Sequence, residues 1–431
     1  MPTPFVARPS LAGYALTLLA LAALSACNSA GSLNAEPAAM VSTPSLGTVE
    51  HSGAACPDPA LPALAALPAA TALPDPFVMA NGSRLTRKAD WACRRHEVSK
   101  QLQAYELGEK PVPVAGAVSA KLDGKTLTVT VNSGGRSISF NANVQLPTTG
   151  TAPYPAVIGI GRSFLNNAEL LARGVAIIDF PNNDIADQQN GSSRNKGKFF
   201  ELHPQAQGTG ALVAWAWGVS RLVDALEQGA APSIDAKHLA VTGCSRNGKG
   251  ALMAGALDER IALTIPQESG SGGSASWRVS DAQKAAGQNV QTLRQIVTEN
   301  VWFRSSFGEF SEAATRLPFD HHQVMALVAP RGLLVIENTA MEWLGNQSGY
   351  VTALAAREAW VALGVADRMG VSQFSHPDHC RLPASQAPEV LAFVDRFLKG
   401  ETSAKTDILR TDGSFAIDRA RWMPWGTPAL K

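Results

Sequence analysis

The segment Gly243-Cys244-Ser245-Arg246-Asn247-Gly248-Lys249-Gly250 follows a short apolar run and opens a glycine-rich helical candidate. A serine on a sharp strand-to-helix turn projects its hydroxyl beyond the sheet, and the helix N-terminus favours developing negative charge. Gly243 and Gly248 give such a tight turn the space it needs. Asn247 breaks the usual Gly-x-Ser-x-Gly spacing, so the pattern alone favours a structural turn, and the partners of Ser245 must decide.

A candidate base lies late in the chain, in Phe374-Ser375-His376-Pro377-Asp378-His379-Cys380. Hydrolases of the α/β type carry nucleophile, acid and histidine in that chain order. The same segment offers metal ligands at His376, Asp378, His379 and Cys380. We disfavour a metal site, because Pro377 prevents helical spacing of the ligands and Cys380 is expected to be oxidised.

The chain has five cysteines: Cys27, Cys56, Cys93, Cys244 and Cys380. Setting Cys27 aside leaves four, which allow three pairings or four free thiols. Cys244 precedes Ser245 and Cys380 follows His379, so a disulfide between these cysteines would fix the nucleophile turn to the base loop. That pairing leaves Cys56 with Cys93, and it favours His379 over His376 as the base.

Two glutamates are candidates for the acid that orients the base. Glu268 follows an apolar run at 263–266, and Glu337 follows another at 333–336, the usual acid position of α/β-hydrolases. Either carboxylate could hold the histidine tautomer and stabilise the imidazolium ion. The residues alone leave this choice open.

Elements that would position these residues can be predicted from hydrophobic patterning. Alternation at 121–134 and 137–146 predicts antiparallel strands joined at Gly134-Gly135. Short apolar runs predict buried parallel strands at 156–160, 175–180, 239–242, 263–266 and 333–336. Helices are expected at 208–227, 250–256, 289–303, 351–363 and 388–398. The fold class is therefore α/β, an α/β-hydrolase three-layer sandwich with a mostly parallel central sheet and antiparallel N-terminal strands.

Composition excludes several classes of protein. The 431 residues include 37 Lys+Arg and 36 Asp+Glu, a balance that argues against nucleic acid as a partner. Only one apolar stretch approaches membrane-spanning length, and it lies at the N-terminus, so an integral membrane bundle is excluded. We expect a monomeric globular protein behind an export signal.

The first 26 residues carry one charge, Arg8, then an apolar stretch that ends in Leu24-Ser25-Ala26-Cys27. This resembles a bacterial lipoprotein signal, which implies cleavage before Cys27 and lipidation of its thiol; an ordinary signal peptide is the alternative. Residues 27–72 are rich in Ala, Pro and Ser and read as a tether. The catalytic domain is expected at 73–431, exported and either lipid-anchored to the bacterial envelope (periplasm or outer membrane) or secreted.

Together these motifs resemble the glucuronoyl esterases of carbohydrate esterase family 15, over roughly residues 73–396. The resemblance implies that Ser245 is the nucleophile, His379 the base and Glu268 the acid, with Arg246 in the oxyanion hole. It also implies a disulfide at Cys380. The positions that bind the sugar in the family are, in this chain, Lys249, Gln291, Glu299 and Trp343.

The implied reaction is hydrolysis of (4-O-methyl)glucuronic acid esters, as in lignin–glucuronoxylan cross-links, without cofactor or metal. Gln291, Gln295 and Glu299 are spaced to share one helix face, which predicts a polar surface for sugar hydroxyls. Two rival functions remain. One is an acetyl-xylan or general carboxylesterase on the same fold, and the other is a lipid-anchored glycan-binding protein without catalysis.

Overall fold

A computed structural model describes residues 49–431. The expected signal peptide, the lipidation site Cys27 and the first part of the expected tether lie outside the described residues. Among the described helices, none combines the length and the apolar character needed to cross a bilayer.

Ten strands form one sheet within residues 49–431, in the order β1-β2-β3-β5-β4-β6-β7-β8-β9-β10. Strands β1, β2, β3 and β5 pair antiparallel in succession, and all pairs from β5 to β10 are parallel. This confirms the predicted fold class. The strand bounds are β1 Val118–Asp123, β2 Thr126–Ser133, β3 Arg136–Gln145, β4 Tyr154–Ile160, β5 Ala176–Phe180, β6 Ile234–Cys244, β7 Leu263–Gln267, β8 Gly332–Glu337, β9 Met369–Gln373 and β10 Leu409–Thr411.

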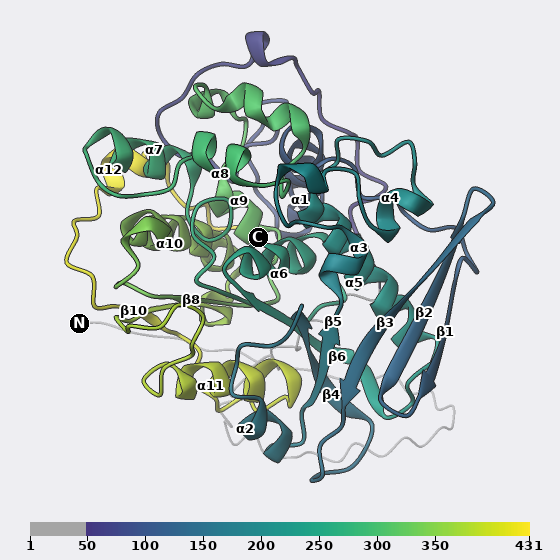
Figure 1. The fold of residues 1–431 in the computed structure, drawn as a ribbon. Helices are drawn as coiled ribbons and strands as arrows, with labels where there is room; N and C mark the ends of the chain where they lie inside the picture. The colour runs from purple at the N-terminus through teal and green to yellow at the C-terminus, as the bar shows by residue number, and fades with distance from the viewer. Residues whose placement is uncertain (1–48) are drawn as a thin grey trace, which may run out of the picture. The chain divides into compact units, whose positions relative to one another are not determined.

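Apolar side chains leave both faces of the parallel strands, because successive residues of a strand point to opposite sides. In β8, Leu333 and Val335 join the larger apolar cluster, whereas Leu334 and Ile336 join a smaller one. Helices α5, α6 and α10 cover the first face, and α2 and α11 cover the second (Figure 1). The parallel strands are thus buried on both faces, as their sequence predicts.

Four of the five expected helices are present as α5 Ala211–Glu227, α6 Arg246–Leu257, α10 Asn346–Leu363 and α11 Ala387–Leu398. The fifth, expected at 289–303, is only α8 Leu293–Glu299. Thr292 caps it in a capping box with Gln295, and Asn300 ends it in an extended conformation. The other helices are α1 Trp91–Leu102, α2 Asn167–Ala172, α3 Asn182–Ile185, α4 Lys198–Leu202, α7 Trp277–Ala285, α9 His321–Ala326 and α12 Arg419–Trp422.

The N-terminal strands differ from the prediction in one respect. The alternating run at 121–134 was expected as one strand, but it is divided between β1 and β2 by a turn at Gly124. Asp-Gly is a strong hairpin signal, since glycine adopts the positive φ that such turns require, and Gly124 has φ 58°. The turn expected at Gly134-Gly135 is present, with positive φ at both residues.

Residues 49–72 pack on the folded body, although the sequence assigns them to the tether. Cys56 forms a disulfide with Cys93 of α1. Glu50 pairs with Lys110 at 2.5 Å and with Arg221 at 2.6 Å. Burial alone would raise the pKa of Glu50, but these two cations lower it below its ordinary value. A disulfide and ion pairs attach this segment, so its Ala- and Pro-rich composition is a poor guide to its packing.

Candidate active site

Ser245 lies between β6 and α6 with φ 59° and ψ −126°. In a residue with a Cβ, this backbone conformation costs about 1–3 kcal/mol of strain energy, and such strained residues concentrate at functional sites. A Cβ at Gly243 would lie 2.3 Å from the carbonyl oxygen of Asn247. One at Gly248 would lie 2.5 Å from that of Gln267. The elbow predicted from the glycines is therefore formed, and both glycines are sterically required.

Asn247 occupies the position where the usual elbow has its last glycine. Its Oδ1 accepts a hydrogen bond from Asn182 Nδ2 at 3.1 Å. Gly161, in the loop after β4, provides the space, since a Cβ there would lie 3.0 Å from Asn247 Nδ2. The larger side chain of Asn247 is thus accommodated because the facing loop has a glycine, Gly161, beside it.

His379 and Glu268, the candidate base and acid, are joined by a short hydrogen bond. The ring Nδ1 of His379 lies 2.7 Å from Glu268 Oε2, while the Cys380 backbone N–H donates to Oε1 at 3.1 Å. Because a buried carboxylate accepts, Nδ1 must carry the proton, and Nε2 is left to accept one. Glu268 follows β7 with φ 46° and is fully buried. The pair has the geometry that fixes a histidine tautomer for general-base catalysis.

His376 contacts the same glutamate less directly. Its Nε2 lies 3.6 Å from Glu268 Oε1, beyond hydrogen-bond distance, and its Nδ1 lies 3.2 Å from Asn338 Nδ2. The His376 side chain is 8% exposed, whereas that of His379 is 29% exposed. Only the His379 ring therefore combines a short bond to the acid with access to an incoming substrate.

The Cys244–Cys380 disulfide joins the residue before Ser245 to the residue after His379, with the two Cα atoms 5.5 Å apart. Both disulfides have the pairing that the sequence favours. Cys244, His379 and Cys380 also have spacing compatible with a metal ion. The two sulfurs are bonded to each other, however, and metal coordination requires thiolates. The cluster therefore serves as a covalent clamp.

Glu337, the alternative acid, is placed against serines. Ser274 Oγ donates to its Oε1, and the backbone N–H of Ser269 lies 3.3 Å from the same atom. Burial, with the charge of Glu268 as a smaller contribution, raises the pKa of Glu337 to about 8. A neutral carboxyl group cannot stabilise an imidazolium ion as Glu268 can, so the geometry favours Glu268.

Three of the candidate sugar-binding residues gather beside the base. Trp343 packs edge-on against the His379 ring, with the ring centroids 4.9 Å apart. The Gln291 backbone N–H donates to the Trp343 carbonyl at 3.1 Å, and Gln291 Nε2 donates to Glu299 Oε2 at 3.0 Å. Gln291 and Glu299 lie together as expected, but the prediction that they share one face of a helix is wrong. Gln291 precedes α8, and Gln295 caps the helix start, so a loop brings Gln291 to Glu299.

Lys249 and Arg246, one turn apart on α6, lie over the same indole ring. The Lys249 Nζ is 5.7 Å and the Arg246 Cζ 5.4 Å from the centroid of Trp302. Lys249 also donates to the Ser269 carbonyl. Burial lowers the pKa of Lys249 to about 8, against the opposing influence of Glu299 and Glu337. Sequence reasoning missed Trp302, although an aromatic residue just after the predicted sugar-binding segment was a signal for it.

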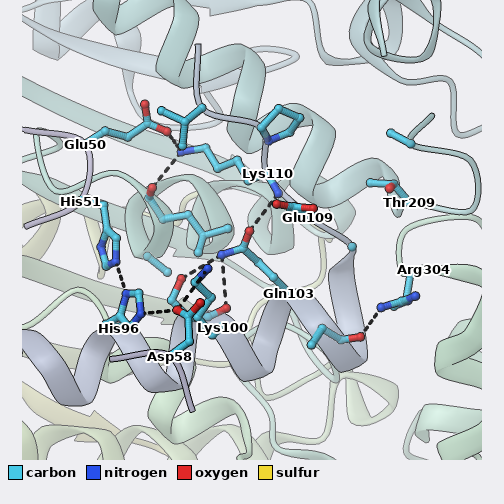
Figure 2. Close-up of a pocket in the computed structure, with 18 of the residues that line it drawn as sticks. Glu50, His51, Asp58, His96, Lys100, Gln103, Glu109, Lys110, Thr209 and Arg304 are labelled. Carbon is cyan, nitrogen blue, oxygen red and sulfur yellow. Dashed lines mark hydrogen bonds and ion pairs between the residues drawn. The ribbon is translucent and has the colours of Figure 1, made fainter. Parts of the chain in front are cut away.

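A cavity of about 840 Å³ lies elsewhere, between α1 and residues 50–61 (Figure 2). Its wall includes Ala256 and Leu257 at the C-terminal end of α6, whereas Ser245 precedes the N-terminal end. His51, His96 and Asp58 form a hydrogen-bonded chain along it. Neither the nucleophile nor the base borders this cavity. A second cavity, of about 880 Å³, is lined by His376, Pro377, Asp378 and Cys380 of the base loop. Cavity size alone therefore does not locate the candidate active site, which is identified by its chemistry.

The chain is similar to known proteins over most of its length. A family model described as "Glucuronyl esterase, fungi" matches residues 129–364. The 4-O-methyl-glucuronoyl methylesterase of Podospora anserina is 50% identical over 84% of this chain and 76% of its own length. That of Hypocrea jecorina is 46% identical over 88% and 80%.

Solved structures extend the likeness. The glucuronoyl esterase catalytic domain from Hypocrea jecorina has a TM-score of 0.82 and 46% identity, covering 86% of this chain and all of its own. A carbohydrate esterase family 15 glucuronoyl esterase from Caldicellulosiruptor kristjansonii has a TM-score of 0.73 and 36% identity, over 83% and 97%. By these similarities, the chain belongs to the glucuronoyl esterases of carbohydrate esterase family 15.

Proposed function

We propose that this esterase hydrolyses esters of 4-O-methylglucuronic acid, with Ser245 as nucleophile, His379 as base and Glu268 as acid. The observation that carries the assignment is the 2.7 Å bond from Glu268 to His379, in a loop clamped by a disulfide beside Ser245. A structure from Sporotrichum thermophile, 44% identical with a TM-score of 0.81, holds methyl 4-O-methyl-β-D-glucopyranuronate. That complex supports the same acid portion as the substrate here.

The reaction follows from the orientation of the base. Ser245 Oγ attacks the C6 carbonyl of the uronate ester and passes its proton to His379 Nε2. Glu268 stabilises the resulting imidazolium ion. The backbone N–H after the nucleophile and the Arg246 guanidinium stabilise the oxyanion, each donor contributing about 3–4 kcal/mol in comparable sites. His379 protonates the leaving alcohol, and water then releases the uronic acid.

The sugar ring is held by groups on the side of α8 and Trp343. The charged and amide groups of Lys249, Gln291 and Glu299 bind ring hydroxyls, and the Trp343 ring lies against an apolar face of the sugar. The hydrogen bond between Gln291 and Glu299 supports this proposal, because it preorganises two of the polar groups. The charge of Glu299 opposes the lowering of the Lys249 pKa by burial, which supports a role for both residues in one site.

Hydrolysis of benzyl glucuronate compared with p-nitrophenyl acetate tests the proposal. We expect a kcat/KM preference for the glucuronate ester, because only that substrate offers ring hydroxyls to the polar groups. A preference for acetyl esters would instead support the acetyl-xylan or general carboxylesterase function. Binding of glucuronoxylan with no turnover of either ester would support the glycan-binding alternative.

The two disulfides indicate an oxidising compartment outside the cytosol. We propose further that residues 1–26 are a bacterial lipoprotein signal, with Cys27 as the lipid site and a tether after it, since Leu24-Ser25-Ala26-Cys27 supports this interpretation. Cys27→Ser should release the protein from the membrane fraction or leave the precursor uncleaved. Unchanged fractionation would contradict the lipid anchor and leave the esterase assignment intact.

A further inference from the structure

We propose that Gln188 and Trp302 form a platform that positions Arg246 for oxyanion stabilisation. The inference rests on the proposed role of Arg246, and it assigns a role to two residues beyond the triad and the sugar-binding set. Both act through Arg246 and neither contacts the reacting atoms, so they are positioning residues. Gln188 lies in the loop between α3 and α4, and Trp302 follows α8.

The side-chain amide oxygen of Gln188 contacts both Arg246 and Trp302. Gln188 Oε1 accepts a hydrogen bond from Trp302 Nε1 at 3.1 Å and a longer one from Arg246 Nη1 at 3.4 Å. The Arg246 guanidinium carbon also lies 5.4 Å from the Trp302 ring centroid. Arg246 is thus contacted on one edge by the amide and on one face by the indole. Two contacts of different direction restrain a planar guanidinium better than one.

The amide itself is fixed by its other bonds. Gln188 Nε2 donates to Asn183 Oδ1 at 3.1 Å, and the Gln188 carbonyl accepts from Asn300 Nδ2 at 2.8 Å. A flipped amide would place its NH₂ group against the N–H donors of Trp302 and Arg246, so this orientation alone satisfies all partners. Gln188 and Trp302 are 7% and 3% exposed, and the hydrogen bond between them is therefore shielded from water.

Arg246 needs such restraint because it is itself exposed. An unrestrained arginine samples many rotamers, and fixing it during the reaction would cost up to ~2 kcal/mol of side-chain entropy. Preorganised donors avoid that cost when the oxyanion forms. The platform therefore acts on kcat, because the charge on the substrate oxygen develops only in the transition state.

A double-mutant cycle between Gln188→Met and Arg246→Ala tests the platform. Methionine keeps the length of the side chain and removes the strong acceptor. We expect Gln188→Met to lower kcat about 10-fold, the effect of a hydrogen bond to a charged group, and to change KM less than about 2-fold. In the Arg246→Ala background the same change should cost less than about 2-fold, since its target is gone.

Gln189→Met is the matched control. Gln189 is the next residue, is exposed, and has no side-chain hydrogen bond among the described residues. Its kcat should equal that of the unaltered protein. If Gln188→Met fails to fold, Trp302→Phe replaces it in the cycle, because phenylalanine keeps a smaller aromatic ring and removes the N–H donor to Gln188.

Equal fractional losses with and without Arg246 would overturn the inference, since they would show general structural support. A raised KM with unchanged kcat would overturn it as well. The cycle is measured on benzyl glucuronate and on p-nitrophenyl acetate. If the unaltered protein hydrolyses only p-nitrophenyl acetate, the proposed substrate is refuted, and the double-mutant cycle on acetate still tests the platform. If the unaltered protein hydrolyses benzyl glucuronate but the kcat losses of the two substitutions are additive, only the platform is refuted.

Discussion

The two ends of helix α6 adjoin buried charges that behave in opposite ways. Near the C-terminal end, Arg260 pairs with Asp224, Glu227 and Asp258 at 2.6–2.8 Å. Burial opposes ionisation there, but Arg260 lowers the pKa of Asp258 below its ordinary value. Arg260 and its three carboxylates thus have partners of opposite sign, so this cluster holds the segment in place.

At the N-terminal end, ionisation is disfavoured instead. Burial lowers the pKa of Lys249 to about 8 and raises that of Glu337 to about 8. Ser245 and Glu268 both hold positive φ values as non-glycine residues. Strained backbone and displaced pKa values together mark a region selected for chemistry at the expense of stability. The contrast teaches that a displaced pKa alone does not locate a site, because burial also lowers the pKa of Arg331 to about 9 beside the C-terminal end of α6. Strained backbone and displaced pKa values coincide only at the N-terminal end.

The largest effects should come from the triad itself. Ser245→Ala and His379→Ala should each lower kcat by about 10⁴-fold or more, because nucleophile and base act as a unit. His376→Ala should leave most activity, since His376 forms no bond to the acid. Steady-state kinetics on benzyl glucuronate decide this. Loss in His376→Ala with near-normal turnover in His379→Ala would reverse the assignment of the base.

The acid should show the next largest effect. Glu268→Gln keeps the shape but removes the charge that stabilises the imidazolium ion, so kcat should fall by about 10³–10⁴-fold. Glu337→Gln should change kcat less than about 10-fold, because Glu337 contacts Ser269 and Ser274. Measuring both variants under identical conditions compares the two carboxylates directly. A mild Glu268 variant beside a severe Glu337 variant would assign the acid to the end of β8.

The sugar-binding groups should give smaller, substrate-selective effects. Lys249→Ala or Glu299→Ala should lower kcat/KM on benzyl glucuronate about 10- to 150-fold, the range for losing a hydrogen bond to a charged group. The loss on p-nitrophenyl acetate should be much smaller, because acetate has no ring hydroxyls. Equal losses on both esters would show that these residues support the fold or the nucleophile.

The two disulfides should separate activity from stability. Cys56→Ser opens a loop of 37 residues and should lower the free energy of unfolding by up to about 3–4 kcal/mol with little change in kcat. Cys380→Ser should reduce kcat as well, because His379 loses its clamp to the nucleophile turn. Chemical denaturation and kinetics on both variants test this. Activity loss of similar size in both would show that neither disulfide is specific to the site.

The last expected effect is a pH dependence of stability and not of activity. The pKa of Glu337 rises from 4.5 to about 8 on folding, so the folded protein binds the extra proton between these values. Stability should therefore fall as pH rises from about 4.5 to 8, by at most about 1.4 kcal/mol per pH unit for one proton. Urea unfolding should show this slope, and Glu337→Gln should reduce it. An unchanged slope in the variant would place the titration elsewhere.

Much of the candidate site could be predicted from chain order and short sequence motifs, whereas the contacts between loops could not. The residues around Ser245 and His379 are contiguous with their cysteines, so adjacency was enough to indicate the clamp. Gln188 comes close to Arg246 only through the path of the α3–α4 loop, which no local pattern encodes. Packing of residues 49–72 was hidden for a related reason: their anchors are single residues, Glu50 and Cys56, in a composition typical of a linker.

The Cys244–Cys380 bond also determines how the molecule responds to mechanical load. It closes 136 residues of chain, which include β7, β8 and β9, into a covalent ring. Tension applied to the two ends of the protein passes across the sulfur bond and bypasses this ring. About 450 Å of extended chain is thereby withheld from stretching. The chain that carries Glu268 and His379 would therefore stay unextended under such a load, even after the strands outside the ring had been drawn out.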